Sequence, residues 1–193
     1  PSEISRKDEI WESPSGLITI AGGKLTGYRK MAEVIVNHVV KNFTDRKLRP
    51  CITKRLPLSG GEVGGSKYFE QYVQRKAQLG VQYGISLEES AKLVKYYGSN
   101  VEQVFAYLQV NHPILPKILY AQLQYGIEHE FVVHPADFFI RRTSSLFFDI
   151  NTVKKYMEAV LEEMQTTLGW STEQRTIYTH ELQAEIVRAT TSR

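Results

Sequence analysis

The sequence predicts a mostly α-helical protein, in which a short strand, a glycine turn and a helix precede a bundle-like helical domain. Three observations support this fold class. A short apolar run lies between glycines near the start, a four-residue apolar spacing follows it, and helix-capping signals recur after residue 66 while strand signals nearly vanish. The 193 residues are 42% hydrophobic and 23% charged, which is the composition of an ordinary globular protein.

The strand and the first helix are predicted from two different spacings. Leu17–Ile20 is a short apolar run bounded by glycines, as a buried strand would be. The next apolar residues recur every fourth position, which places them on one face of a helix. They are Met31, Ile35, Val39 and Phe43.

Gly22 and Gly23 lie between these two patterns, immediately before Lys24. Glycines permit a positive φ and the close approach of a ligand to the main chain, and free N–H groups and the positive dipole end of a helix would face that ligand. Lys24 adds a full positive charge. The junction therefore indicates an anionic or electron-rich ligand, with the alternative that the glycines only allow the strand and helix to pack closely.

The residue composition changes between residues 44 and 66. Residues 44–50 are polar and end in proline, and residues 57–65 are too rich in glycine to continue a helix or a central strand. We therefore expect a first domain segment over residues 1–49, a linker over 50–65 and a helical domain over 66–193.

The helices of the last part are predicted from their ends. Three pairs have the capping-box spacing, in which serine or asparagine is followed three residues later by glutamate or glutamine. They are Ser86 with Glu89, Asn100 with Gln103, and Ser171 with Gln174. A long amphipathic helix is expected to begin at Asn151 and to end at Gly169. We expect five to seven helices without an internal repeat.

Charge and composition argue against several classes of protein. A net charge of +3 is too small to indicate nucleic-acid binding. No apolar run approaches the roughly 20 residues that span a bilayer, and nothing resembles a signal peptide. The single cysteine, Cys51, allows no internal disulfide, which fits a reducing, cytoplasmic setting.

Potential metal ligands gather near the middle of the helical part. Glu128, His129, Glu130 and His134 are close in sequence. Pro135 follows His134 and biases it out of the helical region, away from a shared helical face. We therefore expect no metal site.

The other side-chain groups of this part are interpreted as structural. Arg141 lies four residues after Asp137, so the two can pair on a helix surface, and the doubled arginine Arg141–Arg142 is expected to tie helices together rather than to bind phosphate. His38 and His112 have no evident partner. Ser144 and Ser145 lack any nucleophile context. A set of aromatic residues at helical spacings is expected to pack in and around the core instead of forming a quinone groove: Tyr68, Phe69, Tyr72, Tyr96, Tyr97 and Tyr107.

Four segments of the sequence add a family resemblance. Residues 22–29, Gly-Gly-Lys-Leu-Thr-Gly-Tyr-Arg, resemble the flavin-contacting segment of the FAD-dependent glycerol-3-phosphate dehydrogenases and the related alpha-glycerophosphate oxidases. Residues 1–8 resemble the segment of that family that carries a substrate-phosphate arginine. Residues 137–143 and 169–171 are similar to landmarks of its helical C-terminal domain. The resemblance runs the length of the chain, in order.

The resemblance implies a cofactor, a substrate and an electron acceptor. The cofactor is FAD, and sn-glycerol 3-phosphate is oxidised to dihydroxyacetone phosphate. The dehydrogenases pass the electrons to quinone from a peripheral position at the inner face of the plasma membrane, whereas the oxidases reduce O2 to hydrogen peroxide. The segment does not separate these two alternatives.

The resemblance also implies that much of the enzyme is missing. The glycine-rich dinucleotide-binding turn of the family does not occur here. We therefore expect a C-terminal piece, with residues 1–49 ending the FAD- and substrate-binding domain. This fragment alone is expected to be inactive and to retain no FAD, and the catalytic residues are expected upstream.

The resemblance assigns individual residues as well. Gly22, Gly23, Lys24, Leu25 and Thr26 match the flavin contacts, and Lys24 is also a candidate substrate ligand.

Arg6 matches the arginine that anchors the substrate phosphate, where a planar bidentate donor suits the oxyanions. From the residues alone, an ordinary surface ion pair of Arg6 with Asp8 or Glu9 is the alternative.

A second hypothesis concerns the helical domain by itself. Its helices carry no recognisable catalytic constellation, so it would serve as a module for homodimer formation or partner binding, without chemistry of its own.

Overall fold

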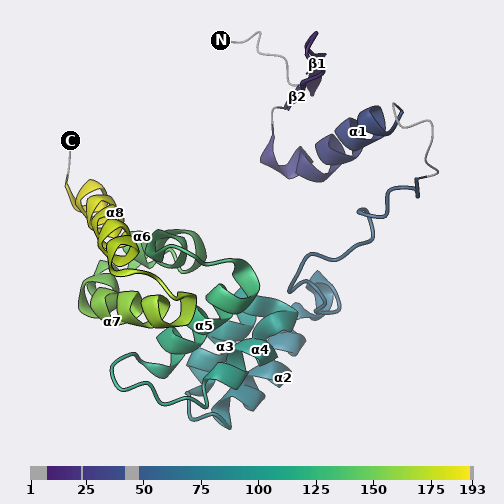
Figure 1. Ribbon diagram of the computed structural model, residues 1–193. Coiled ribbons are helices and arrows are strands. Elements are labelled where there is room, and N and C mark those ends of the chain that lie inside the picture. The colour runs from purple at the N-terminus through teal and green to yellow at the C-terminus, as the bar shows by residue number, and fades with distance from the viewer. Residues whose placement is uncertain (1–7, 23, 42–47, 192–193) are drawn as a thin grey trace. The chain divides into compact units, whose positions relative to one another are not determined.

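The computed structural model describes residues 8–22, 24–41 and 48–191 (Figure 1). The chain divides into two compact units, Pro1–Leu58 and Ser59–Arg193, which we call unit 1 and unit 2 and describe separately. Arg6, Gly23 and Phe43 lie outside the described residues.

Unit 1 is a hairpin followed by a helix. Strands β1 (Glu9–Glu12) and β2 (Ile18–Ala21) pair antiparallel, with Ile10 opposite Ile20. The connection needs Gly16, whose φ of 82° lies in the left-handed region. A 3₁₀ turn, η1 (Leu25–Gly27), then leads directly into α1 (Tyr28–Val40), which confirms the predicted strand, turn and helix.

Two details of the strand differ from the prediction. The strand begins at Ile18 rather than Leu17, and it pairs with β1, which the sequence analysis did not identify. The expectation that it is buried is wrong for this chain, because Leu17 is 66% exposed and no described residue of unit 1 is buried. A two-stranded hairpin and one helix are too small to enclose a core.

Unit 2 is helical and contains seven α-helices within its described residues, as the sequence predicted (Figure 1). In chain order they are α2 (Phe69–Val81), α3 (Leu87–Tyr97), α4 (Val101–Tyr107), α5 (Lys117–Glu130), α6 (Ser145–Phe148), α7 (Ile150–Leu168) and α8 (Thr172–Thr190). Two 3₁₀ turns, η2 (Ser66–Tyr68) and η3 (Gly98–Asn100), precede α2 and α4, and a π-helix, η4 (Asp137–Arg142), precedes α6.

Two hydrophobic cores fill unit 2, and α5 contributes to both. Leu119 and Leu123 belong to a core shared with η4, α6, α7 and α8. Ala121 and Tyr125 belong to a core shared with α2, α3 and α4. Residues two positions apart on a helix point to nearly opposite sides. Helix α5 therefore lies between the two cores and joins them.

Most of the predicted helix ends are confirmed. Ser86 and Ser171 each accept the backbone N–H three residues on, and Glu89 and Gln174 bond back to the cap residues, which completes both capping boxes. Gly169 ends α7 with a φ of 68°.

Two caps are corrected. Asp149, not Asn151, caps α7, and its side chain accepts the Thr152 N–H at 3.2 Å. Asn100 makes no side-chain cap, because its amide nitrogen donates instead to the Ser59 hydroxyl at 2.7 Å. That partner is distant in sequence and gives no local signal.

The glycine-rich stretch is partly fastened to unit 2. The Ser99 N–H donates to the Gly60 carbonyl at 2.9 Å. A Cβ on Gly98 would lie 2.0 Å from that same oxygen, so only glycine fits there. Residues from Ser59 onward therefore pack with the helices, although the sequence suggested a linker as far as residue 65.

Helices α2 and α3 cross closely at a glycine. A Cβ on Gly80 would lie 2.1 Å from the Ser90 hydroxyl oxygen. Ser90 is fully buried, and its hydroxyl has no hydrogen-bond partner. Since a buried unpaired hydroxyl loses its hydration without replacement, Ser90 lowers the stability of the unit.

We expect opposite outcomes for two serine substitutions in α3. Ser90→Ala removes the unpaired hydroxyl and should leave the free energy of unfolding unchanged or raise it. Ser86→Ala removes a capping box and should lower it by about 1 kcal/mol. Urea unfolding followed by circular dichroism measures both, and a clear loss of stability in Ser90→Ala would contradict this account of the α2–α3 crossing.

Candidate functional site

The candidate site is the N-terminal end of α1. Lys24 is extended, with φ −131° and ψ 130°, and immediately precedes η1. The Gly27 N–H donates to the Lys24 carbonyl at 2.9 Å, and the Tyr28 N–H donates to the Leu25 carbonyl. The N–H groups of Leu25 and Thr26 precede these first bonds and have no partner within the helical segment.

This end of the helix is open to ligands. Lys24, Leu25 and Thr26 are all exposed, and Leu25 is 91% exposed. The positive end of the α1 dipole, two backbone donors that have no partner among the described residues and an ammonium group thus share one turn. Such a surface stabilises an anion or the electron-rich edge of a polar ring.

Gly22 lies close to the ends of two side chains. A Cβ at this position would lie 2.5 Å from Asp8 Oδ1 and 2.6 Å from Met31 Cε. Its φ lies outside the left-handed region, so Gly22 does not use the positive φ that glycine permits. The close contacts of Gly22 favour the packing alternative at this position.

A second contact fixes the far end of α1 to the hairpin. His38 Nε2 lies 3.4 Å from Glu12 Oε2 at the end of β1. No local pattern predicts this pair, because 26 residues separate the partners. Helix α1 thus lies along the hairpin, with Met31 beside Gly22 and His38 beside Glu12.

The first turns of α1 carry a small ionic cluster. Glu33 Oε2 accepts a hydrogen bond from each of the two terminal nitrogens of Arg29, both at 3.0 Å. The same oxygen lies 3.2 Å from Lys30 Nζ. Hydrogen bonds from Lys30 and Arg29 hold the pKa of Glu33 below its ordinary value. Arg29 also donates to the Thr53 hydroxyl at 3.2 Å.

The residues considered as metal ligands each contact a different partner. Glu128 accepts the Tyr107 hydroxyl at 2.8 Å, Glu130 lies 3.5 Å from Arg142 Nε, and His134 Nδ1 lies 3.1 Å from a carboxylate oxygen of Glu181. Within residues 8–22, 24–41 and 48–191, no three His, Cys, Asp or Glu side chains gather closely enough to hold a metal ion.

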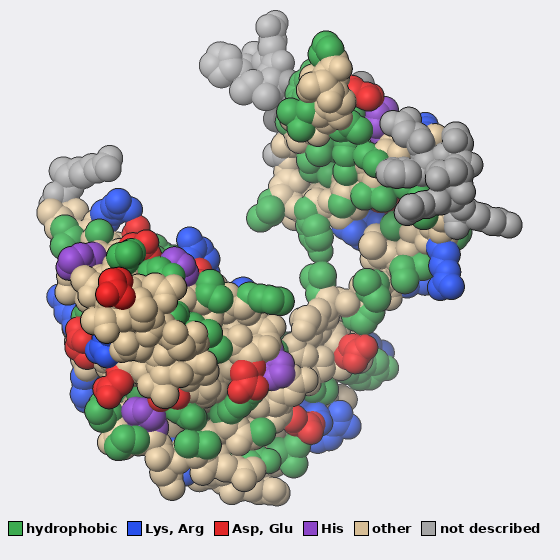
Figure 2. Space-filling model, viewed as in Figure 1, with side chains coloured by type: hydrophobic (Ala, Val, Ile, Leu, Met, Phe, Trp, Pro, Cys, Tyr) green, Lys and Arg blue, Asp and Glu red, His purple; other side chains and the backbone are tan. Residues whose placement is uncertain are grey.

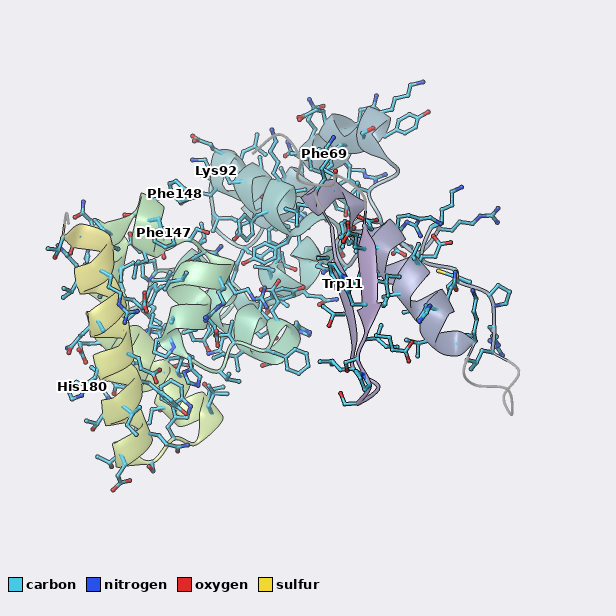
Figure 3. All side chains as sticks on the ribbon, turned by 90° about the horizontal axis from the view of Figure 1, so that it is seen from above. Trp11, Phe69, Lys92, Phe147, Phe148 and His180 are labelled. Atoms are coloured by element: carbon cyan, nitrogen blue, oxygen red, sulfur yellow. The ribbon has the colours of Figure 1, made fainter. Side chains whose placement is uncertain are left out.

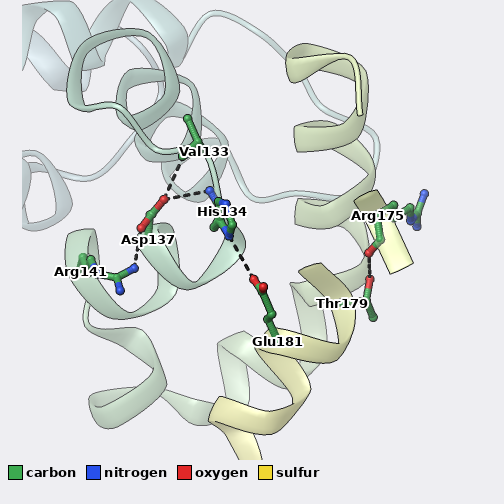
Figure 4. Close-up of polar contacts among 7 residues, drawn as sticks. All are labelled: Val133, His134, Asp137, Arg141, Arg175, Thr179 and Glu181. Carbon is green, nitrogen blue, oxygen red and sulfur yellow. Dashed lines mark hydrogen bonds and ion pairs between the residues drawn. The ribbon is translucent and has the colours of Figure 1, made fainter. Parts of the chain in front are cut away.

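The doubled arginine makes structural contacts. Arg141 pairs with Asp137 at 2.5 Å, as its spacing predicted, and the other Asp137 oxygen accepts the N–H groups of Val133 and His134 (Figure 4). Burial acts in the opposite direction, but these hydrogen bonds hold the pKa of Asp137 below its ordinary value. Arg142 donates to the Glu130 carbonyl at 2.7 Å and so ties η4 to the end of α5.

One polar cluster was missed from the sequence. His112 Nδ1 accepts the backbone N–H groups of Ile114 and Leu115 at 3.1 and 2.8 Å. Its Nε2 lies 3.5 Å from Glu163 Oε2, and Gln124 donates to the other Glu163 oxygen at 2.6 Å. These contacts join the loop before α5 to α7. Glu163 is far in sequence from both His112 and Gln124, so no local pattern predicts the cluster.

The aromatic residues pack as expected. Tyr97 is buried and packs edge-on against Tyr125 at 5.1 Å, whereas Tyr68 and Tyr96 are half exposed. Burial, with a hydrogen bond to Glu128, raises the pKa of Tyr107 to about 12. These aromatic residues therefore pack in the core and at its boundary.

Apolar side chains also reach the surface. Hydrophobic atoms lie on the visible faces of both units (Figure 2). Phe147 and Phe148 project from α6, with 61% and 88% of their surfaces exposed, and Trp11 projects from β1 (Figure 3). None of the helices that the structure describes has the length and apolar character needed to cross a membrane.

Comparisons with known proteins place this geometry in context. Residues 51–175 match the family model described as the C-terminal domain of alpha-glycerophosphate oxidase. The aerobic glycerol-3-phosphate dehydrogenase of Bacillus subtilis is 47% identical over 190 residues, which cover 94% of this chain and 34% of that protein. The enzyme of the same name from Staphylococcus haemolyticus is 45% identical over 98% of this chain and 35% of its own length.

A solved structure is similar as well. It is the X-ray structure of the glycerol-3-phosphate dehydrogenase from Bacillus halodurans complexed with FAD. The match has a TM-score of 0.87 and 40% identity, and it covers 96% of this chain and 38% of that chain. The chain therefore spans about a third of the length of the relatives that it matches.

Two glycines at the site provide a matched test. Gly22→Ala places a methyl group against the Asp8 carboxylate and the end of the Met31 side chain, so these two side chains must move and the contact of Met31 with the hairpin changes. Gly27→Ala meets nothing within 4 Å at an ordinary φ of −80°. We expect faster amide hydrogen exchange along α1 in Gly22→Ala and little change in Gly27→Ala. Equal exchange rates in the two variants would show that Gly22 does not determine the packing of α1.

Proposed function

The chain belongs to the family of aerobic glycerol-3-phosphate dehydrogenases and alpha-glycerophosphate oxidases, and we propose that it is the C-terminal part of an FAD-dependent enzyme that oxidises sn-glycerol 3-phosphate to dihydroxyacetone phosphate. The observation that carries this proposal is the turn at Lys24–Thr26, where the Leu25 and Thr26 N–H groups, which have no partner among the described residues, and a lysine lie at a helix N-terminus. The similar structure from Bacillus halodurans, which was solved with FAD, supports it.

The donors of this turn fit the cofactor chemically. When bound, FAD accepts the hydride that leaves C2 of the substrate, and its ring system gains negative charge. The N–H groups of Leu25 and Thr26, the α1 dipole and the Lys24 ammonium would stabilise that charge at the ring edge. Gly22 and Gly23 belong to the same proposed flavin contact. The hydroxyl proton of the substrate must pass to a base in the part of the enzyme outside this chain.

The electron acceptor is proposed to be quinone. The curated relatives reported above are aerobic dehydrogenases, which supports electron transfer to membrane quinone by a cytoplasmic enzyme held peripherally at the membrane. The second candidate acceptor is O2, reduced to hydrogen peroxide, because the matching family model is named for the oxidase.

Two measurements on the full-length enzyme test this proposal. Anaerobic addition of glycerol 3-phosphate should bleach the enzyme-bound flavin, and a flavin that stays oxidised would refute the proposed reaction. Comparing reoxidation by O2 with reoxidation by a soluble quinone then decides between the two acceptors.

The helical unit has a separate proposed role. Its titratable groups connect different elements, as with Arg142 and the Glu130 carbonyl and with His134–Glu181. This supports a structural or partner-binding role for unit 2, with homodimer formation as one form of it. The chemistry would then lie at unit 1 and in the preceding part of the enzyme.

We expect Lys24→Ala to slow flavin reduction in the full-length enzyme. Removing one donor to developing charge typically costs about a hundredfold in rate, while FAD retention depends on many contacts and should change little. Stopped-flow absorbance measures the reduction, and flavin content is measured beside it. Lys92→Ala is the control, because Lys92 pairs with Glu88 on the exposed surface of α3 in unit 2. An unchanged rate in Lys24→Ala would make Lys24 a structural residue.

The phosphate assignment of Arg6 rests on the resemblance. We expect Arg6→Lys to impair the full-length enzyme although the charge is kept, because an ammonium cannot engage two phosphate oxygens as a planar fork does. Arg6→Ala should raise KM for glycerol 3-phosphate sharply while hardly changing the much slower oxidation of glycerol. Equal losses on both substrates would mean that Arg6 supports the fold or the flavin instead.

A further inference from the structure

The segment Cys51–Leu58, which we call the arm, belongs to the helical domain by sequence and to unit 1 by its contacts. The family model of the C-terminal domain begins at residue 51. The chain up to Leu58 nevertheless forms one compact unit with the hairpin and α1. The helical domain thus begins with a short segment that lies on the helix of the candidate site.

A polar clasp joins the arm to the start of α1, and it consists of Arg29, Glu33 and Thr53. Arg29 Nη1 donates to the Thr53 hydroxyl at 3.2 Å and, together with Nη2, to Glu33 Oε2 at 3.0 Å. Arg29 is the second residue of α1. The clasp therefore acts on the helical turn that follows Lys24, Leu25 and Thr26.

The tip of the arm is itself organised. The Arg55 N–H donates to the Ile52 carbonyl at 2.9 Å, which closes a turn around Thr53. The Cys51 sulfur lies 3.1 Å from the Thr53 hydroxyl. Thr53 is thus presented to Arg29 at the head of a turn.

Apolar packing does not hold the arm in the same way. A groove of about 710 Å³ lies between α1 and the arm and is lined by Val36, Val40, Ile52, Leu56 and Leu58, among others. Ile52 and Leu58 are 67% and 70% exposed. The clasp is therefore the direct tie between the arm and α1, and the 31% exposure of the Arg29 side chain gives it partial shelter from water.

We infer that the arm positions the N-terminal turn of α1 through this clasp, so that Arg29 and Thr53 are positioning residues for the flavin edge. The second part of this inference rests on the proposed function. Unit 1 has no buried residue among those described, so a few polar contacts set the orientation of the turn. Donors misplaced by about 1 Å lose much of their effect on the rate of a reaction.

The test uses two conservative variants in the full-length, FAD-loaded enzyme. Thr53→Val keeps the shape of the side chain and removes the hydroxyl, and Arg29→Lys keeps the charge and removes the fork. Both should speed amide exchange over residues 25–31, make the flavin midpoint potential more negative, and slow flavin reduction roughly tenfold. The double variant should be no worse than Arg29→Lys alone, because Arg29→Lys already removes the Arg29–Thr53 contact together with the fork to Glu33.

Controls come from α8. Arg188→Lys alters an exposed ion pair with Glu185, and Thr176→Val removes a hydroxyl that bonds only within its own helix. Neither should change the exchange of residues 25–31 or the flavin potential.

The measurements distinguish the positioning role of the clasp from the proposed flavin contact of the turn. Unchanged exchange over residues 25–31 in both variants would overturn the positioning role, whatever the flavin does. Faster exchange with an unchanged potential and reduction rate would support the clasp and refute the proposed flavin contact of the turn. Changes in all three measurements would support both.

Discussion

Helix α5 is buried on two sides, and the arrangement of the whole helical unit depends on that burial. Leu119 and Leu123 pack toward α7 and α8, while Ala121 and Tyr125 pack toward α3 and α4. Each large apolar side chain buried in this way contributes about 1.5–3 kcal/mol. Because the two cores share one helix, neither half of the unit keeps its geometry without the other.

The end of α5 also determines how the chain continues. Phe131 is in the left-handed conformation and is 89% exposed, and the Val132 N–H returns to the Gly126 carbonyl at 3.0 Å. A Cβ on Gly126 would lie 3.0 Å from Val132 Cγ2. The main chain therefore reverses tightly, and Arg142 fastens the following π-helix to the same helix end. The landmark motif at residues 137–143 thus serves the architecture of unit 2.

Unit 1, unlike unit 2, has no buried residue among those described. Helix α1 contacts the hairpin at Gly22 and through His38–Glu12, and it contacts the arm through Arg29–Thr53. Such contacts fix the direction of a helix, but each exposed pair adds little stability. The turn at Lys24–Thr26 accordingly keeps its donors free for a ligand. In the family, about two thirds of the polypeptide lies outside the matched segment, and its side chains would complete the burial.

Local signals explain which features could be predicted from the sequence. Capping at Ser86 and Ser171 depends on residues three positions away, so it was predicted correctly. Strand β1, the Asn100–Ser59 bond and the His112–Glu163 pair depend on partners far along the chain, and no local pattern identifies them. At the candidate site, spacing predicted a ligand-binding turn, whereas the identity of the ligand came from the family motif.

The central claim is that the Lys24–Thr26 turn faces the flavin. A crystal structure of the full-length protein with FAD measures this directly. The account predicts that the backbone nitrogens of Leu25 and Thr26 lie within hydrogen-bond distance of the pyrimidine edge of the flavin ring, with Lys24 beside it. A structure in which this turn contacts only protein or solvent, while the ring lies elsewhere, would contradict the claim.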